Sequence, residues 1–188
     1  EAALDSFTAE VIQLGNQLIA HRHDLVPALA PRIQAAHQRI APGGEELNVE
    51  YVPSVKTDFA ADLERIHERE RKQGATLIGP HRDELALLLH DRPAADYASE
   101  GQKRTIAIAL KIAQAEHLSE IHGVPPVLLI DDVMGELDEQ RRQGFLPLLE
   151  QCGSGRGQVF MTCTEENWPR ELSRTLQRWQ VSDGLLTQ

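Results

Sequence analysis

The spacing of hydrophobic positions changes near residue 45 and divides the chain into two parts. Over the first part, apolar side chains recur at intervals of three, four, three, four and seven residues, at Leu4, Phe7, Val11, Leu14, Leu18 and Leu25. This spacing is typical of a coiled-coil seam or a helical hairpin. Because Pro27 and Pro31 interrupt it, we expect two short antiparallel helices, the second over 31–40 and ended by Pro42. Residues 1–45 are thus predicted to form a helical arm.

Residues 46–188 are predicted to form the body of the protein. The pattern indicates strands over 47–52, 75–78, 85–89, 127–130 and 158–162, a turn at 91–93, and helices over 57–73, 102–120 and 139–151. The apolar runs 127–130 and 158–162 carry no alternating polar residues, which is typical of parallel strands covered on both faces. We therefore expect an α/β fold in which helices cover a parallel sheet.

Composition narrows the function classes only slightly. The chain has 188 residues and a formal net charge of −10. This charge argues mildly against nucleic-acid binding by the whole surface, although it leaves room for a local basic strip. Because no apolar run approaches the ~20 residues of a membrane span, we expect a cytoplasmic protein that binds no membrane. The first residue is Glu1 rather than Met, so we expect the chain to be a piece of a longer protein.

The strongest candidate chemistry lies at the end of the run Val127–Asp132. A buried strand that ends in two adjacent carboxylates brings both to the carboxyl edge of the sheet, where α/β folds bind ligands. An acid there is costly without a cation, and Mg²⁺ with nucleotide phosphates is the usual solution. In this interpretation Asp131 holds Mg²⁺ and Asp132 positions and polarises the attacking water. On this stretch alone, a strand-to-helix turn with Asp as N-cap is an equally good interpretation.

A second candidate precedes that strand, where Ser99 to Arg104 opens a long helix. A Ser hydroxyl, free backbone amides and a Gly that allows close approach make an anion site at a helix start. The alternative is plain N-capping by Ser99. A further acid, Asp138, stands six residues beyond Asp132.

Three motifs in this order and spacing resemble those of ABC ATPases. Ser99-Glu100-Gly101-Gln102 resembles the signature, the strand 127–132 resembles Walker B, and Glu136-Leu137-Asp138 resembles the D-loop. Together with Gly79-Pro80-His81-Arg82-Asp83 they resemble the RecF family of SMC-like ATPases. The resemblance is strong over 76–138, weaker to 164, and only architectural over the first 50 residues.

The resemblance implies the carboxyl-terminal part of an ABC-type head that forms an ATP-dependent homodimer with Mg²⁺. By this resemblance Ser99, Glu100, Gly101 and Gln102 would contact ATP held by the other subunit, and Asp138 would couple the two sites. It also implies DNA repair at gapped or single-stranded/double-stranded junction DNA, with RecR and RecO as partners. Within the protein, the partner would be the amino-terminal lobe.

The chain also departs from the pattern of ABC ATPases. Glu100 stands where Gly is common, Asp132 where Glu is usual, and Thr164 where many members place a switch His. No stretch matches the P-loop G-x-x-x-x-G-K-[ST], because the only Gly-rich run, 153–157, lacks the Lys and precedes a strand. We therefore expect ATP hydrolysis only in combination with the missing P-loop lobe.

Two alternatives to this function remain open at this point. One is a non-catalytic interaction module that pairs with another ABC head. The other, a transporter nucleotide-binding domain, is disfavoured by Glu100 and the segment 79–83. Elsewhere, basic residues at 65–72 alternate with Glu, which favours a solvated face of salt bridges over a DNA-binding strip. At the loop, Arg82 could equally reach phosphate or pin the loop to a carboxylate.

Overall fold

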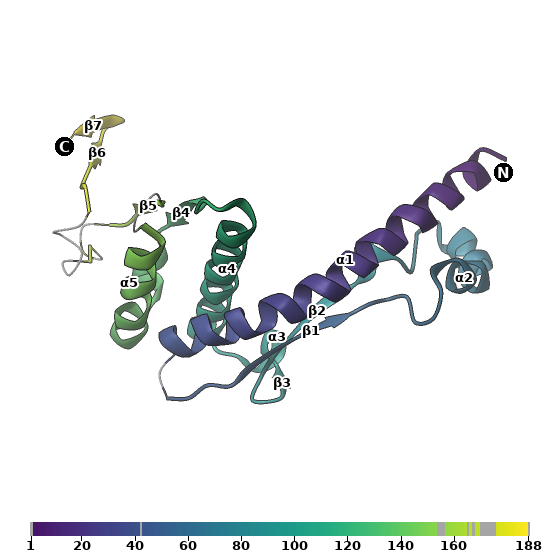
Figure 1. Ribbon diagram of the computed structural model, residues 1–188, viewed down its shortest axis with the longest axis horizontal. Coiled ribbons are helices and arrows are strands. Elements are labelled where there is room, and N and C mark those ends of the chain that lie inside the picture. The colour runs from purple at the N-terminus through teal and green to yellow at the C-terminus, as the bar shows by residue number, and fades with distance from the viewer. Residues whose placement is uncertain are drawn as a thin grey trace. The chain divides into compact units, whose positions relative to one another are not determined.

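A computed structural model describes residues 2–41, 43–153, 157–164, 166, 168–169 and 176–187, with side chains from residue 8 onward except at 153. These residues divide into two compact units (Figure 1). Unit 1 comprises 1–35 and 45–98, and unit 2 comprises 36–44 and 99–188. The predicted division of the chain at residue 45 into an arm and a body stays a prediction. Among the described helices, none has the length and apolar composition to cross a membrane.

The first element, α1 (Ala2–Ile40), is one continuous helix, so the predicted hairpin is wrong. Pro27 and Pro31 lie inside the helix, and both are exposed, so water can hydrate the carbonyl groups that proline leaves without an N–H donor. A stripe of buried and half-buried positions runs along the helix with the same three-four spacing, at Ile12, Gly15, Ile19, Arg22, Val26, Leu29 and Ile33. Packing along this stripe outweighs the cost of the prolines, which isolated propensity cannot foresee.

The residues expected to form the seam of the hairpin lie on another side of α1. Val11, Leu14, Leu18 and Leu25 are all exposed. The stripe that packs in unit 1 is displaced by one residue from the stripe that the sequence pattern favoured.

Unit 1 is built on an antiparallel sheet of order β1-β2-β3: β1 (Leu47–Val52), β2 (Glu84–Leu89) and β3 (Arg92–Pro93). Between β1 and β2 lie α2 (Phe59–Gln73) and the 3-10 turn η1 (Pro80–Arg82), and α3 (Ala94–Tyr97) follows β3. The predicted strands 47–52 and 85–89 and the helix that ends at Gly74 are confirmed. Gly74 has a φ of 63°, the left-handed conformation that glycine adopts without strain.

Two local predictions in unit 1 are wrong. The segment 75–78 forms no strand, because a backbone donor in it and one just after it bind side chains instead of a neighbouring strand. Leu77 N donates to the Glu70 carboxylate, and Gly79 N donates to Ser54 Oγ. The turn predicted at 91–93 falls one residue earlier, at His90 and Asp91, which both have positive φ.

Unit 2 contains a parallel strand pair packed with helices. Its elements are α4 (Glu100–His122), β4 (Val127–Asp131), the 3-10 turn η2 (Val133–Glu136), α5 (Glu139–Gly153) and β5 (Gln158–Thr162). β4 and β5 pair in parallel with Val127 opposite Gln158 and Asp131 opposite Thr162. The predicted parallel strands and both helices are confirmed. A short antiparallel hairpin, β6 (Gln180–Ser182) and β7 (Leu185–Thr187), was not predicted.

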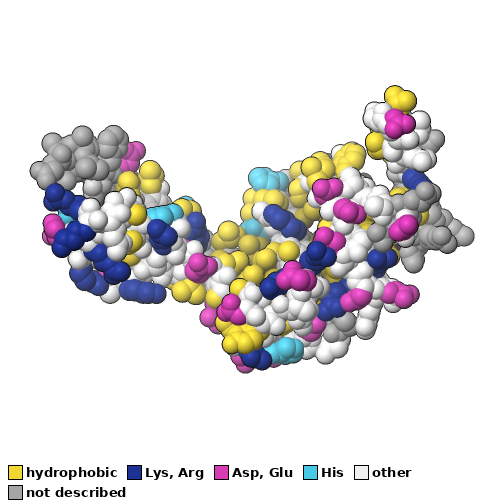
Figure 2. Space-filling model, turned by 180° about the vertical axis from the view of Figure 1, so that it is seen from behind, with side chains coloured by type: hydrophobic (Ala, Val, Ile, Leu, Met, Phe, Trp, Pro, Cys, Tyr) yellow, Lys and Arg dark blue, Asp and Glu magenta, His cyan; other side chains and the backbone are white. Residues whose placement is uncertain are grey.

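Helices cover only one face of the β4–β5 pair within the described residues. Leu128 and Ile130 are half-buried, whereas Val127, Leu129 and Phe160 on the other face are 56%, 75% and 60% exposed. The expected cover on both faces is therefore absent here, and the apolar character of the runs reflects a face that the described part of the chain leaves open. Apolar side chains at the surface appear yellow in the space-filling view (Figure 2).

The core of unit 2 joins α4, α5 and the end of α1. Its fully buried side chains include Ile40, Ile112, Met134, Phe145 and Leu148. Gly144 of α5 lies against the backbone of α1, because a Cβ there would collide with the Arg39 carbonyl oxygen and lie 2.9 Å from Ile40 Cα. The packing of α5 on α1 thus requires glycine at this position.

Candidate functional site

Asp131 and Asp132 lie at the carboxyl end of β4, where the sequence predicted them. Both are exposed, and Thr162 at the end of β5 connects them. Its hydroxyl donates to Asp131 Oδ1 and accepts a bond of 3.0 Å from the Asp132 backbone N–H. Asp132 has left-handed backbone angles, φ 49° and ψ 27°, so the chain kinks there as it enters η2. The N-cap alternative finds no support, because the Asp132 side chain makes no capping bond to η2.

The start of α4 is fixed by a capping box. The Ser99 hydroxyl accepts from Gln102 N at 3.3 Å, and the Gln102 side chain accepts from Ser99 N at 2.8 Å. Glu100 forms an exposed ion pair with Lys103 at 3.3 Å. Ser99 therefore caps the helix, as the simpler interpretation of the sequence holds, and phosphate binding by Ser99, Glu100, Gly101 and Gln102 stays a prediction.

Gly101 faces open space. A Cβ added to it would meet no atom within 4 Å. Packing within the described chain thus gives no reason for glycine in the first turn of α4, where alanine has the higher helix propensity. A glycine at such a position is expected where a group from outside the chain approaches the backbone closely.

The segment after β4 contacts the first turns of α4. Arg141 at the start of α5 donates through Nη1 to Asp138 Oδ2 and through Nε to Thr105 Oγ1 at 3.0 Å. Thr105 in turn donates to the Gly101 carbonyl at 2.9 Å. An ion pair of 3.0 Å also joins Arg104 to Glu136. The structure thus brings the predicted signature and D-loop segments together within unit 2.

Asp138 is held in its ionised form by its own helix. The Arg141 backbone N–H donates to Asp138 Oδ1 at 2.8 Å, and this bond, followed by the bond from the Arg141 side chain, lowers the pKa of Asp138. The Asp138 side chain is nevertheless 52% exposed. One side of this carboxylate therefore stays accessible to groups outside the chain.

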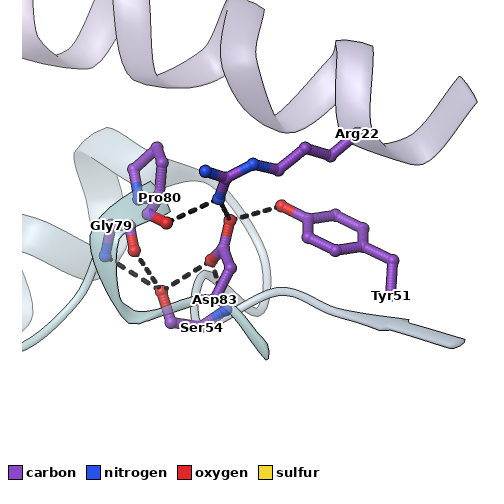
Figure 3. Close-up of polar contacts among 6 residues, drawn as sticks. All are labelled: Arg22, Tyr51, Ser54, Gly79, Pro80 and Asp83. Carbon is purple, nitrogen blue, oxygen red and sulfur yellow. Dashed lines mark hydrogen bonds and ion pairs between the residues drawn. The ribbon is translucent and has the colours of Figure 1, made fainter. Parts of the chain in front are cut away.

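The loop 79–83, which contributed to the family resemblance, closes around Asp83 in unit 1 (Figure 3). The Asp83 side chain is only 2% exposed. It accepts hydrogen bonds from Arg22 at 2.7 Å, from the Tyr51 hydroxyl, and from Ser54 N and Oγ at 2.9 and 3.1 Å. Arg22 also donates to the Pro80 carbonyl, and the single hydroxyl proton of Ser54 is within reach of both Asp83 and the Gly79 carbonyl. The network fixes the loop to α1 and β1.

These bonds shift the pKa values of Asp83 and Tyr51. Burial alone would raise the pKa of Asp83, but the hydrogen bonds from Tyr51, Ser54 and Arg22 outweigh it and lower that pKa. Burial and the bond to Asp83 raise the pKa of Tyr51 to about 12. Asp83 is therefore a charged, fully bonded structural group.

Among the described residues, Arg82 bonds a backbone carbonyl rather than a carboxylate, and its reach to phosphate stays a prediction. Its Nε and Nη2 donate to the Thr76 carbonyl at 3.2 and 3.1 Å, whereas Arg22 pins the loop to the carboxylate. On α2, where Lys and Arg side chains gather (Figure 2), Arg65 pairs with Asp62 and Arg71 with Glu68. Both ion pairs are of the kind that the sequence favoured over a DNA-binding strip.

The oxygen-rich end of β4 fits a magnesium ion better than a transition metal. Asp131 supplies one carboxylate, and Mg²⁺ in nucleotide sites is bound by one or two carboxylates together with phosphate oxygens and water. Within the described ranges, no three His, Cys, Asp or Glu side chains cluster as an all-protein metal site would require. Magnesium binding by Asp131 therefore stays a prediction.

Two residues at the site were missed from the sequence. Thr162 was seen only as the end of a strand, and Arg141 as part of a helix. The pairing of β5 beside β4 could have suggested Thr162, since neighbouring parallel strands end at the same edge. No pattern in the sequence could have indicated that Arg141 reaches Thr105.

Comparison with known proteins identifies relatives along nearly the whole chain. The DNA replication and repair protein RecF of Moorella thermoacetica is 37% identical over 187 residues, which cover 98% of this chain and 49% of that protein. RecF of Synechocystis sp. is 35% identical over 195 residues, covering 98% of this chain and 48% of that protein. The chain spans about half the length of the curated relatives it matches. No family model matches it.

Two solved structures of RecF are also similar to this chain. A structure of the recombination mediator protein RecF-ATP in the RecFOR pathway matches with a TM-score of 0.72 and 26% identity, over 100% of this chain and 50% of that one. A RecF-ATPrS structure matches with a TM-score of 0.75 and 26% identity, over 99% and 50%. The predicted fold class, the carboxyl-terminal portion of an ABC-type head, is confirmed.

Proposed function

The chain matches the carboxyl-terminal half of the RecF family of DNA replication and repair proteins, and on that premise we propose that it supplies one half of an ABC-type ATPase. In this proposal it contributes the signature, Walker B and D-loop segments. The P-loop, which no stretch of this sequence matches, comes from the amino-terminal half. The chain hydrolyses ATP only when the two halves combine.

The observation that carries this proposal is the pair of exposed acids at the end of a sheet whose second face is open within the described residues. Asp131 and Asp132 stand at the carboxyl edge of β4, where α/β folds bind ligands. Asp132 would accept a proton at its carboxylate from the water that attacks the γ-phosphate. Asp131 would hold Mg²⁺, which neutralises phosphate charge when bound. The bonds from Thr162 fix the strand end that carries both acids.

The open face of the sheet supports the need for a second half. A contiguous apolar surface that includes Leu129 at 75% and Phe160 at 60% exposure costs free energy in water. In this proposal the amino-terminal half covers that face and extends the sheet. The same contact would bring the P-loop to the carboxyl edge.

The start of α4 supports a role across a dimer interface. The open space at Gly101 leaves room for a group from outside the chain, and the helix start favours an anion. In this proposal Ser99, Glu100, Gly101 and Gln102 contact the nucleotide held by the second subunit of an ATP-dependent homodimer. Asp138 couples the two sites.

The remaining functional features come from the family. The RecF protein of one similar solved structure is a recombination mediator in the RecFOR pathway. We extend to this chain the binding of gapped or junction DNA and of RecR and RecO, as properties of the complete protein.

Reconstitution tests the proposal. The P-loop half and this chain are mixed, and ATP hydrolysis is measured with wild-type protein and with Asp132→Asn. We expect hydrolysis only from the mixture, and a loss of at least about a hundredfold in the variant, because it removes the group that activates water. An undiminished rate in Asp132→Asn would remove Asp132 from the reaction. ATP-dependent association without any hydrolysis would instead favour a non-catalytic interaction module.

A further inference from the structure

Arg141 connects two segments that the proposed function assigns to different tasks. It lies in the first turn of α5 and is only 12% exposed, in contrast to its partner Asp138. Its planar guanidinium binds two groups at once: Asp138 through Nη1 and Thr105 through Nε. We infer that Arg141 is a positioning residue, which holds the Asp138 carboxylate and the first turns of α4 in one fixed arrangement.

Thr105 makes this connection continuous. Its side chain is fully buried. The hydroxyl accepts from Arg141 Nε and donates to the Gly101 carbonyl, so it uses its proton in one direction and a lone pair in the other. The bonds run from Asp138 through Arg141 and Thr105 to Gly101 without an intervening water. A displacement of Asp138 therefore acts on the backbone of the proposed signature.

A second contact between the same segments serves as a comparison. Arg104 and Glu136 also join α4 to the segment before α5, at 3.0 Å, but their side chains are 41% and 44% exposed. Solvent screens such a pair, and its contribution is small. The bond from Arg141 to Thr105 is less exposed to solvent, because the Arg141 side chain is 12% exposed and Thr105 is fully buried. Arg104→Gln is therefore the matched control.

The inference rests on the proposed function, since a positioning role has meaning only where Gly101 contacts nucleotide and Asp138 couples the two sites. In that function the Asp138 carboxylate meets the second subunit while Arg141 stays bonded to Thr105. Engagement of the partner and alignment of the helix start are then one event. Loss of this alignment should therefore lower the rate of ATP hydrolysis, because alignment matters most in the transition state, and should leave ATP binding nearly unchanged.

Four substitutions in the chain test this in the reconstituted pair of halves. Thr105→Val keeps the shape and removes the hydroxyl, whereas Thr105→Ser restores it. Arg141→Lys keeps the charge but cannot bind both partners at once. We expect kcat for ATP hydrolysis to fall about tenfold in Thr105→Val and Arg141→Lys, with KM for ATP within about twofold. Thr105→Ser should keep the wild-type kcat, and Arg104→Gln should lower kcat less than Thr105→Val does.

A measurement without ATP separates this inference from the proposed function. Hydrogen exchange of amides 99–104 is followed in the same variants without nucleotide, and Thr105→Val should speed it about tenfold while Arg104→Gln does not. If Asp132→Asn abolishes hydrolysis but Thr105→Val and Arg141→Lys match wild type in kcat and exchange, the positioning role is wrong and the ATPase stands. A loss in Thr105→Ser equal to that in Thr105→Val would also overturn it, because the hydroxyl would then be irrelevant.

Discussion

Two aspartates, Asp83 in unit 1 and Asp131 in unit 2, differ in their exposure to solvent and in the number of hydrogen bonds that they accept. Asp83 in unit 1 is buried and accepts four hydrogen bonds from three residues. Asp131 in unit 2 is exposed, and among the described residues it accepts a hydrogen bond from the Thr162 hydroxyl. A carboxylate whose lone pairs are filled within the chain is structural. A carboxylate left open at the carboxyl edge of a sheet has capacity for a ligand.

The comparison also shows why a family resemblance does not by itself identify a site. The loop 79–83 contributed to the resemblance together with the signature, yet its carboxylate is bonded within the chain and holds the loop to α1 and β1 (Figure 3). Only the contacts distinguish the two. Three substitution experiments test this difference.

Removal of the two acids should give the largest contrast. Asp83→Ala leaves Arg22, Tyr51 and Ser54 without their common acceptor in a buried place, so we expect the free energy of unfolding to fall by roughly 3 kcal/mol. Asp131→Ala should lower it by less than about 0.5 kcal/mol, as exposed substitutions do. Urea denaturation followed by circular dichroism measures both. Equal losses would show that Asp83 is not the structural acid described here.

Low pH should reduce the stability of unit 1, because the hydrogen bonds to a second aspartate, Asp62, need its ionised form. Asp62 accepts from Lys56 N at 2.7 Å and from Thr57 N and Oγ1 at 3.2 and 2.9 Å. These bonds, with that from Lys56 first, lower the pKa of Asp62 from 3.8 to about 2. A lowered folded pKa stabilises the protein above pH 3.8, and this stability is lost as pH falls towards 2.

The measurement is the free energy of unfolding as a function of pH. Because Asp62 has the lower pKa in the folded state, it makes the free energy of unfolding rise with pH in that window. Asp62→Asn should remove its share and flatten the curve between these pH values. An unchanged slope in the variant would contradict the assignment of this acid.

The smallest effect on stability should come from the open sheet face of unit 2. Leu129→Ser alters a side chain that is 75% exposed, so unfolding of the isolated chain should change by less than about 0.5 kcal/mol. Leu128→Ser, its neighbour on the helix-covered face, should cost roughly 1–2 kcal/mol. Association with the P-loop half should respond in the opposite order, with at least about a tenfold loss for Leu129→Ser. Titration of one half with the other measures this affinity. An equal loss of affinity in both variants would argue against an interface on this face.

The local signals in the sequence predicted most of the elements. The helix before Gly74 and the strands at 47–52 and 158–162 follow from hydrophobic period and turn residues, and the structure has them. The hairpin β6–β7 could also have been predicted, because Asp183 and Gly184 form a turn dipeptide that takes positive φ at both positions. These features depend on neighbours in the chain.

What the sequence could not predict depends on contacts between distant segments. The continuity of α1 through Pro27 and Pro31 depends on its packing stripe, and the absence of a strand at 75–78 depends on Glu70 and Ser54. At the site, the strand end predicted where Asp131 and Asp132 lie, whereas the reach of Arg141 to Thr105 required the fold. The hydrophobic pattern thus predicts the positions of the two acids, whereas tertiary packing determines which side chains bond to the site.

The kink at Asp132 restricts the acids that this position can carry. Among residues other than glycine, Asn and Asp enter the left-handed region at the least cost, and a longer acid would bring added strain. The shorter side chain, one methylene less than the glutamate usual in ABC ATPases, is therefore matched to the bend in the backbone. Asparagine is thus the replacement that removes charge while preserving the turn, whereas alanine would alter chemistry and conformation together.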